Sequence, residues 1–434
     1  PSKGKRRLKN DVRMRGFAER VDVEIVDAFL SDHVGVLAGE SVPLLESGAR
    51  VLAEAVISEV NVPEFARSAM DGYAIRGEET FGASAYDAIQ LSVVGLSLPG
   101  APYKGVIGKG QAIRIMTGAP VPEGADAVVK AEVCEELDGM VSISAATPPK
   151  KNVGAIGEDI KRGESILSPG RRLRPQDIGL LASIGRASLR CIRRPRVRLV
   201  ITGNELLPAG SLPTGTQIVD SNSVVLRQLV ARDGGLSLPF EIIPDEPERI
   251  REAMADEEAD VILVSGGTSV GQEDHAPRLL SELGRLEFHG ISMRPSSPTG
   301  IGRIGSRMVF LLPGNPVSCL AAYEFFAGPT IRALGGRNRN WPHRRVRVPL
   351  ARKIVSEIGR TDYVRVAIEK GTATPIATSG ASILSSTVRA AGAVIVPRAL
   401  EGMNEGEFVE VLLYDEEAPD QQPLRVAAIP RDAP

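Results

Sequence analysis

The sequence predicts a multidomain α/β plus β protein. We expect a central doubly wound α/β domain, a small inserted β domain, a mixed N-terminal region and a C-terminal β-barrel-like domain. Three observations predict this fold class. A chain of 434 residues exceeds what one hydrophobic core usually supports. Strand-like and helix-like segments alternate in the middle of the chain, and short apolar or alternating runs dominate one stretch before it and one after it.

The N-terminal part combines a mixed region with a β insertion. Residues 16–60 have helix-like periodicity, as in ESGARVLAEAVISEV at 46–60, and PQDIGLLASIG at 175–185 is helical again. Between them, DAIQLSVVG, GQAIRIM, ADAVVKAEVC and GMVSISA alternate with Gly and Pro signals, as β-strands do. We therefore expect residues 16–65 and 150–193 to form a linker subdomain, interrupted by a β subdomain at 66–149.

The α/β domain is expected at residues 194–337. Its strand candidates are RVRLVI, LPFEII, VILV and MVFLL. Its helix candidates are the segment capped by Ser221 or Asn222, then PERIREAMADEE, APRLLSEL and the long apolar VSCLAAYEFFAGPTIRAL. This alternation predicts a largely parallel sheet, and such sheets bind ligands at the carboxyl ends of their strands.

A C-terminal β domain is expected at residues 338–434. The runs RRVRVPL, YVRVAI, AVIVP and EFVEVLLY alternate with period two, which is typical of strands with one buried face. The change from an alternating strand–helix pattern to strands alone follows GGRNRNWP, which we interpret as the connection between the two domains.

The composition excludes several classes of protein. Lys and Arg (52) nearly balance Asp and Glu (54), so neither nucleic acid nor an anionic membrane is expected as the main partner. Three scattered cysteines and four histidines without zinc-type spacing argue against a structural zinc or a disulfide framework, and favour a reducing, cytoplasmic compartment. No run approaches the ~20 apolar residues of a membrane span. The basic opening, PSKGKRRLKNDVRMRG, lacks the apolar core of a signal peptide, and we interpret it as a solvated tail.

Three loops follow predicted strands and are expected to converge on one edge of the sheet. They are TGNEL at 202–206, SGGTSVGQED at 265–274 and PGNP at 313–316. In the second loop, glycine N–H groups suit an oxyanion, whereas Glu273 and Asp274 would repel one. A divalent cation shared by acid and anion would resolve this conflict. A tight strand-to-helix turn without a ligand is the alternative, and the loop alone does not decide between them.

Other candidates in this domain also have structural alternatives. Glu205 at a strand end is either a solvated acid or a site residue. Asp245 or Glu246 is expected to cap the helix PERIREAM, although a capping Asp245 can still face a site. The PGNPVS segment is either a rigid turn or a helix start that offers N–H groups to an anion. Cys319 is expected to be a buried small residue rather than an activated thiol, and His275 a loop or cap residue.

Six stretches in order resemble the MoeA family, which includes the C-terminal domain of gephyrin. They are SAMDGYAIRG, IMTGAPVPEGADAVV, GEDIKRGESIL, TGNEL, SGGTSVGQED and LLPGNPVS, within a match from about residue 35 to 425. The resemblance implies a molybdopterin-binding type of α/β domain. It also implies insertion of molybdate into the dithiolene of adenylylated molybdopterin, with release of AMP. In this interpretation the glycine loops hold oxyanions of pyrophosphate and molybdate, and carboxylates hold Mg²⁺ between them.

The resemblance further implies partners and site residues. Family members are elongated homodimers with four subdomains per chain, and the site lies between the α/β domain of one chain and the β insertion of the other. The preceding adenylyltransferase and recipient molybdoenzymes are the other expected partners. Carried over by motif, the expected catalytic positions are Asp71, Thr117, Asp159, Glu205, Asp245 and Asp274, with Glu205 and Asp274 as metal ligands. The expected substrate-binding positions are Gly266, Gly267, Thr268, Ser269, Gly271, Arg294, Ser297, Pro313, Gly314, Asn315 and Pro316.

One stretch departs from the family pattern. Many members have a KPGKP-like segment, where this chain has RPSSP at 294–298. Arg294 keeps a cation, which we expect to contact oxyanions of molybdate or of the substrate's phosphates. The alternative is that Arg294 pairs with an acid and stiffens the loop between its prolines.

Two other functions remain open at this point. One is a pterin-binding carrier or scaffold of the same fold, and the other is the related adenylyltransferase step. The presence of all the acids and anion loops favours the molybdenum-inserting enzyme over the carrier. The β insertion and the C-terminal β domain favour it over the adenylyltransferase.

Overall fold

The computed structural model describes residues 20–268, 274–377 and 380–414. The basic opening segment, Ser269, Gly271 and the end of the expected C-terminal domain lie outside the described residues. Contacts divide the chain into two compact units, residues 40–191 and residues 1–39 with 192–434. None of the helices in the described ranges combines the length and apolarity needed to cross a lipid bilayer.

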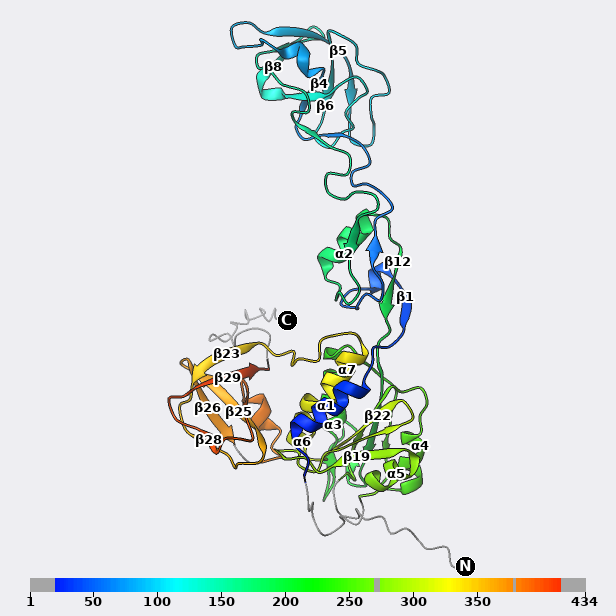
Figure 1. Cartoon of the computed structure of the whole chain (residues 1–434), viewed down its shortest axis with the longest axis vertical. Helices are drawn as coiled ribbons and strands as arrows, with labels where there is room; N and C mark the ends of the chain where they lie inside the picture. Colours follow the sequence, from blue (N-terminus) through cyan, green and yellow to red (C-terminus); the bar gives the residue numbers. More distant parts are fainter. Residues whose placement is uncertain (1–19, 269–273, 378–379, 415–434) are drawn as a thin grey trace, which may run out of the picture. The chain divides into compact units, whose positions relative to one another are not determined.

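The β insertion is confirmed as a six-stranded sheet within the 40–191 unit (Figure 1). Its strand order is β7-β4-β6-β5-β9-β8, and all of its pairs are antiparallel except β5 with β6, which is parallel. Tyr73, Leu91 and Val129 lie in its core. The strands are β4 (Gly72–Ile75), β5 (Ile89–Ser97), β6 (Gln111–Ile115), β7 (Ala127–Lys130), β8 (Cys134–Leu137) and β9 (Met140–Ile143).

In the rest of this unit, helix α2 (Pro175–Ser183) lies beside short strand pairs. The prediction of a helix here is confirmed. The helix expected at 46–60 is wrong. Ala49 has a positive φ of 61°, and Val51 and Leu52 form bridges to Arg172 and Cys191 instead. The β-branched residues of this stretch suit the extended pairing, and their apolar spacing mimicked a helix. The pairs are β1 (Gly39–Pro43) with β12 (Ser188–Ile192), β2 (Val56–Ile57) with β11 (Ser165–Leu167), and β3 (Arg67–Ser68) with β10 (Val153–Gly154).

The α/β domain contains a seven-stranded sheet of order β16-β13-β18-β22-β21-β19, with β17 also paired to β13. The prediction of a largely parallel sheet is confirmed, because all the pairs from β16 to β22 are parallel. An antiparallel β21–β19 edge was not predicted. The strands are β13 (Arg196–Thr202), β16 (Leu236–Ser237), β17 (Ile242–Ile243), β18 (Val261–Ser265), β19 (Arg285–His289), β21 (Gly300–Ile304) and β22 (Arg307–Leu312).

Helices cover both faces of this sheet, as Figure 1 shows. Phe310 of β22 packs into the core under α1, α3, α6 and α7, whereas its neighbour Val309 packs under α4 and α5. The long apolar helix is confirmed as a continuous run with a π-helical segment at Tyr323–Ala327. Helix α1 lies within the 16–60 stretch predicted to be helical, but it packs on the α/β domain rather than in the linker subdomain. The helices are α1 (Val23–His33), α3 (Asn222–Arg232), α4 (Pro247–Met254), α5 (Ala276–Leu283), α6 (Pro316–Ala322) and α7 (Gly328–Leu334).

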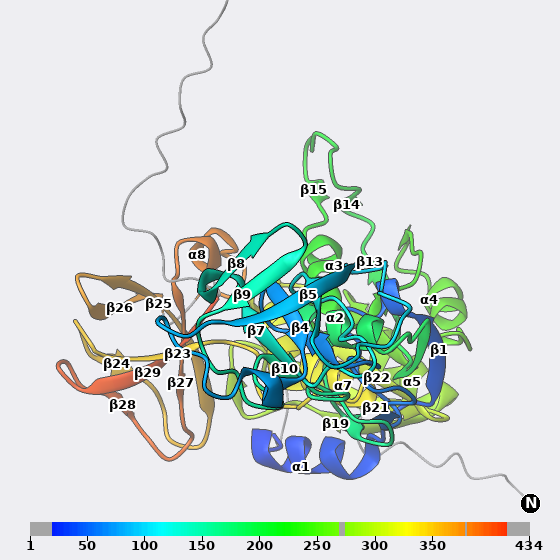
Figure 2. The same cartoon turned by 90° about the horizontal axis from the view of Figure 1, so that it is seen from above.

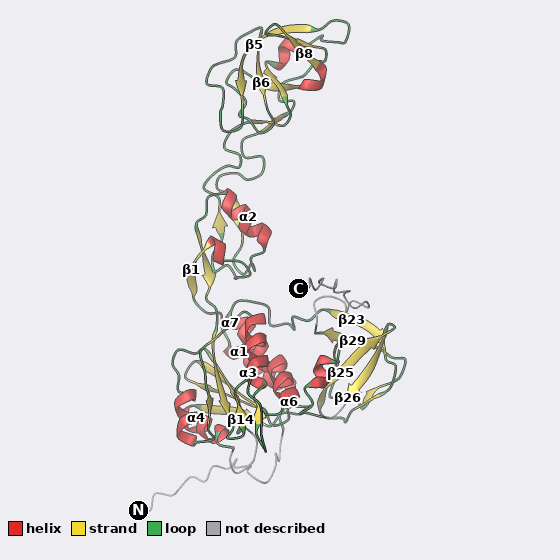
Figure 3. Cartoon of the chain, turned by 180° about the vertical axis from the view of Figure 1, so that it is seen from behind, coloured by secondary structure: helices red, strands yellow, loops and turns green. Residues whose placement is uncertain are grey.

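The C-terminal domain is built mostly of strands, drawn yellow in Figure 3. Its sheet has the order β20-β25-β27-β29-β23, with β26 paired to β25. Strand β20 precedes the expected domain boundary yet pairs with β25, so the RPSSP segment is joined to this domain. The elements are β20 (Met293–Arg294), β23 (Arg345–Pro349), β24 (Ile354–Val355), β25 (Thr361–Glu369), β26 (Thr372–Ala377), α8 (Ser385–Val388), β27 (Gly392–Val396), β28 (Gly402–Met403) and β29 (Phe408–Leu413).

A short excursion leaves the α/β domain after the TGNEL loop. Strands β14 (Leu206–Leu207) and β15 (Ile218–Val219) pair in parallel, and the loop between them extends beyond α3 (Figure 2). The chain returns from β15 directly to the start of α3. This return brings residues 218–222 to the carboxyl edge of the sheet.

Candidate functional site

The three loops converge as the sequence predicted. Strands β13, β18 and β22 are neighbours in register, with Ile201 opposite Ser265 and Ser265 opposite Leu312. The loops that follow them therefore start at the same edge of the sheet. Together with the chain segment that returns to α3, they line a pocket of about 520 Å³ that includes Glu205 and Gly314.

Gly266 lies where the three loops meet. Its φ is +106°, and a Cβ at this position would lie 2.1 Å from the carbonyl oxygen of Thr202. On the other loop, a Cβ built on Gly314 would lie 4.0 Å from the Cα of Gly266. Close backbone packing and a positive φ therefore require glycine at position 266, whereas the contact at Gly314 is an ordinary one.

Asp245 does not cap α4; Glu246 is at the N-cap position, although its side chain makes no capping hydrogen bond. The carboxylate of Asp245 accepts a short hydrogen bond from the hydroxyl of Thr202 and one from the backbone N–H of Asn204 at 3.3 Å. The Asn204 side chain in turn accepts the backbone N–H of Asp245, also at 3.3 Å. This happens because β17 pairs in parallel with β13 and carries residue 245 to the TGNEL loop. Asp245 therefore holds the loop on which Glu205 stands.

Two residues that sequence reasoning missed, Asp220 and Asn222, line the same pocket. Asp220 is buried, and its carboxylate accepts the backbone N–H of Ser223 at 3.1 Å. It therefore caps α3 in place of Ser221, whose side chain makes no capping bond. The side-chain nitrogen of Asn222 donates to the hydroxyl of Ser265 at 2.9 Å and to the carbonyl of Gly314 at 2.8 Å. In the sequence, Asp220, Ser221 and Asn222 precede an amphipathic helix. This pattern indicates a helix cap, and nothing in it indicates that Asp220 and Asn222 also line a pocket.

Both the side chain and the backbone carbonyl of Thr268 make contacts that hold the residue in place. Its hydroxyl donates to the carbonyl of Leu312 at 2.9 Å, and its own carbonyl lies 3.1 Å from the Nε2 atom of His289. Burial lowers the pKa of His289, although the Thr268 hydrogen bond and the charge of Asp274 oppose this shift. A neutral imidazole that donates from Nε2 is the form that matches this contact. The electrostatic effect on His289 also places Asp274 near the same loop.

The start of α6 is less free than the sequence suggested. The backbone N–H of Val317 donates to the carbonyl of Ala381 at 2.9 Å, so a loop of the C-terminal domain already uses it. Ser382 of that loop lines the pocket, a contribution the sequence did not reveal. Cys319 is confirmed as a buried residue, and burial raises its pKa to about 12. Its thiol is therefore protonated at neutral pH and is not an activated nucleophile.

Arg294 pairs with an acid, which is the alternative to an oxyanion contact that the sequence left open. Its guanidinium donates a short hydrogen bond to the carboxylate of Asp362 and a 3.3 Å bond to the carbonyl of Val355. Asp362 is 1% exposed and also accepts from Arg360 and Ser356, at 2.9 Å each. The charge of the Arg294 guanidinium is therefore largely neutralised by Asp362 within the protein.

We therefore expect Arg294→Ala to lower stability by about 1–3 kcal/mol, because it removes one of three charged or polar donors from a buried carboxylate. The molybdate concentration for half-maximal activity should stay unchanged. Thermal unfolding and a molybdate titration on the same variant check both points. Arg294→Lys should recover part of the stability. An altered molybdate dependence with unchanged unfolding would instead support the oxyanion contact.

The neighbouring serines of RPSSP differ from each other. Ser296 has a φ of 89°, a conformation that favours glycine, and its hydroxyl donates to the carbonyl of Ser318 at 2.5 Å. The hydroxyl of Ser297 is buried without a hydrogen-bond partner among the described residues. The serine at the family's glycine position is thus held by a bond to the helix that follows PGNP.

In the 40–191 unit, Asp71 and Thr117 form a pair. The backbone N–H and the hydroxyl of Thr117 both donate to one carboxylate oxygen of Asp71, at 2.7 Å each. The backbone bond and then the hydroxyl bond lower the pKa of Asp71, which is therefore ionised at neutral pH. Asp159 is exposed, and its backbone N–H donates to the carbonyl of Val62 at 3.0 Å.

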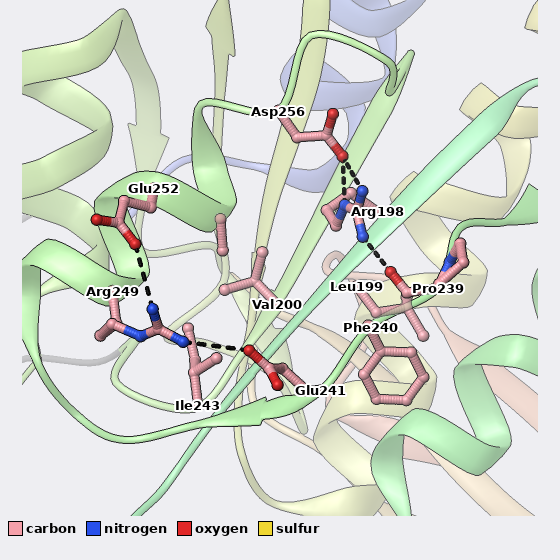
Figure 4. Close-up of a pocket in the computed structure, with 11 residues that line it drawn as sticks. Arg198, Leu199, Val200, Pro239, Phe240, Glu241, Ile243, Arg249, Glu252 and Asp256 are labelled. Carbon is pink, nitrogen blue, oxygen red and sulfur yellow. Dashed lines mark hydrogen bonds and ion pairs between the residues drawn. The ribbon is translucent and has the colours of Figure 1, made fainter.

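A second pocket of about 480 Å³ lies beside α4 (Figure 4). Its charges are mutually paired, because Arg198 contacts Asp256, and Arg249 contacts Glu241 at 3.1 Å and Glu252 at 3.4 Å. Each guanidinium in Figure 4 is directed at such a partner. The first pocket, with its exposed glycine backbone and its acids, is therefore the better candidate site.

Comparison with known proteins gives three family models that match the chain in order. The MoeA N-terminal region (domain I and II) matches residues 21–185, the Probable molybdopterin binding domain matches 198–333, and the MoeA C-terminal region (domain IV) matches 347–414. A molybdopterin molybdenumtransferase of Haemophilus influenzae is 35% identical over 332 residues, covering 75% of this chain and 80% of that protein. One from Bacillus subtilis is 32% identical over 401 residues, covering 89% and 92%. The crystal structure of a MoeA protein of molybdopterin biosynthesis from Pyrococcus horikoshii has a TM-score of 0.80 at 32% identity, and covers 92% of this chain and 100% of that one.

Proposed function

Because this chain belongs to the MoeA family and takes part in molybdenum cofactor biosynthesis, we propose that it is the transferase that inserts molybdate into adenylylated molybdopterin and releases AMP. The observation that carries this proposal is the pocket at the carboxyl edge of the sheet. There the backbone of Gly266 and Gly314 is open to an oxyanion, and Glu205 and Asp220 stand beside it. A carrier without catalytic activity would not need this combination.

The acids and the proposed substrates carry the same sign of charge, which points to a cation. Among the described residues, no three His, Cys, Asp or Glu side chains are grouped as a complete metal site. Mg²⁺ usually takes one or two carboxylates and completes its shell with phosphate oxygens and water. Glu205 lines the pocket, and Asp274 lies near the loop after β18. We assign Glu205 and Asp274 as the residues that would hold Mg²⁺. The ion would supply charge neutralisation at the phosphoanhydride.

The chain's own residues then have distinct tasks. Glycine backbone at Gly266 and Gly314 lets the oxyanions approach the N–H groups of the loops. Asp245 holds the TGNEL loop and so orients Glu205. Gly314, Asn315 and Pro316 of the PGNP loop line the pocket, and buried Thr268 ties the glycine loop to Leu312. In this arrangement the substrate is positioned for cleavage of its phosphoanhydride, and positioning of this kind supplies much of the rate enhancement in phosphoryl chemistry.

We propose that Asp71 and Thr117 of the β insertion, and Asp159 of the linker subdomain, act in the same reaction. Ionised Asp71 is positioned by Thr117, which suits either metal binding or orientation of a polar substrate group. The family resemblance assigns these residues to a homodimer in which a second chain contributes the insertion. Homodimer formation, the adenylyltransferase and molybdoenzyme partners, and a cytoplasmic location remain predictions.

The proposed function is tested by incubating the purified chain with adenylylated molybdopterin, Mg²⁺ and molybdate. AMP release and active molybdenum cofactor should both appear, and both should fall when Mg²⁺ is chelated. Tight pterin binding without AMP would identify a carrier. Absence of AMP and cofactor in the presence of all three components would contradict the enzyme assignment.

Glu205→Gln and Asp274→Asn are expected to reduce turnover by about 10²-fold, the order observed when a group that stabilises reaction charge is removed. The unfolding free energy should change by less than about 0.5 kcal/mol, because neither change opens a core cavity. Steady-state kinetics and denaturant unfolding provide the two measurements. Glu257→Gln, an exposed acid beyond α4, is the matched control. Unchanged turnover in both site variants would show that the metal ligands are misassigned.

A further inference from the structure

Asn222 joins two loops of the pocket from a third element. It is the first residue of α3, and its side-chain nitrogen donates to Ser265 at the end of β18 and to Gly314 in the PGNP loop. The two distances, 2.9 and 2.8 Å, are those of good hydrogen bonds. Both amide hydrogens of Asn222 are thereby used.

The Asn222 contact lies beyond the point where the strand ladder holds the two loops together. The ladder between β18 and β22 ends at the pair of Ser265 with Leu312, so it does not hold the loops beyond that pair together. Gly266 and Gly314 approach each other there but have no side chains with which to form a contact. Thr268 provides one tie, through its bond to Leu312. Among the described residues, Asn222 provides a further tie, which contacts Gly314 directly.

We propose that Asn222 is a positioning residue, which sets the separation of the two glycine-bearing loops that receive the substrate's oxyanion groups. The inference rests on the proposed function, because it assigns those loops to phosphate or molybdate oxygens. The amide suits this task, because it donates twice and carries no charge. A carboxylate in its place would face the Gly314 carbonyl without a hydrogen and would add a negative charge beside Asp220.

The test uses Asn222→Asp and Asn222→Ala in the full chain. Asn222→Ala removes both donors, and Asn222→Asp also adds charge at nearly constant volume. Because a displacement of about 1 Å can cost about 10²-fold in rate, kcat/KM for adenylylated molybdopterin should fall by about that factor in Asn222→Ala, and further in Asn222→Asp. Asn338→Ala is the control, since it removes a 2.7 Å side-chain contact to Asn340 away from the pocket.

Amide hydrogen exchange gives a second readout that does not depend on turnover. In both variants, exchange should accelerate at residues 266–268 and at Gly314 and Asn315, and stay unchanged in the strands of the sheet. Faster exchange throughout the domain would mean that Asn222 is merely structural, which overturns the inference. Faster loop exchange with normal kinetics would overturn it as well. If the wild-type chain released no AMP, the proposed function would fail, whereas unchanged loop exchange in an active enzyme would contradict Asn222 alone.

Discussion

Gly266→Ala is expected to remove nearly all molybdenum insertion, a loss of more than about 10²-fold. The new Cβ would lie 2.1 Å from the Thr202 carbonyl oxygen, so the backbone of one loop must move. The φ of +106° adds a conformational cost of about 1–2 kcal/mol for any residue other than glycine. Since Thr202 also binds Asp245, the displacement reaches the loop that carries Glu205.

Gly305→Ala separates these two costs. Gly305 connects β21 to β22 with a φ of +62°, but a Cβ there meets nothing within 4 Å. It therefore shares the conformational cost without the clash. AMP release and thermal unfolding should be measured for both variants. If the two lose activity equally, close packing of Gly266 is not what shapes the pocket.

The sequence predicted the elements that place the site because their signals are local. Strand β18 is buried along its whole length, and its sequence VILV is accordingly a continuous apolar run. The glycines that follow it indicate a loop. The convergence of the three loops then followed from the rule for parallel sheets. These are properties that each segment carries in its own residues.

What the sequence could not reveal depends on pairing between distant segments. Asp245 has the local pattern of a helix cap, and only the parallel pairing of β17 with β13 brings it to Thr202. Arg294 has the pattern of an oxyanion ligand, and its partner Asp362 is 68 residues away on a strand of the next domain. In both cases the tertiary contact outweighed a plausible local interpretation.

A buried ionic network provides the second large effect. Asp233, at the end of α3, is 1% exposed and accepts from Arg332 at 2.8 Å, from Arg232 at 2.9 Å and from the hydroxyl of Tyr323 at 3.0 Å. Arg232 also contacts Glu324 in the π-helical segment. Burial raises the pKa of Glu324, but the His343 ring 3.3 Å away and the hydrogen bonds and charge of Arg232 outweigh it and lower the pKa to about 2. Stability from Glu324 is therefore present above its ordinary value of 4.5 and is lost as the pH falls toward 2.

We expect Asp233→Ala to lower the unfolding free energy by about 3–5 kcal/mol at pH 7, because it leaves Arg332 buried without its carboxylate. Arg332 is only 4% exposed, so water cannot replace the lost partner. The matched control is Glu282→Ala, which also removes a carboxylate with two arginine partners, Arg251 and Arg278, but at a site where the side chain is 39% exposed. There the loss should be at most about 1 kcal/mol, since solvent screens the pair. Denaturant unfolding of the two variants compares them directly. Equal losses would show that burial does not determine the strength of this network, and that the charges at the end of α3 contribute no more than a surface pair.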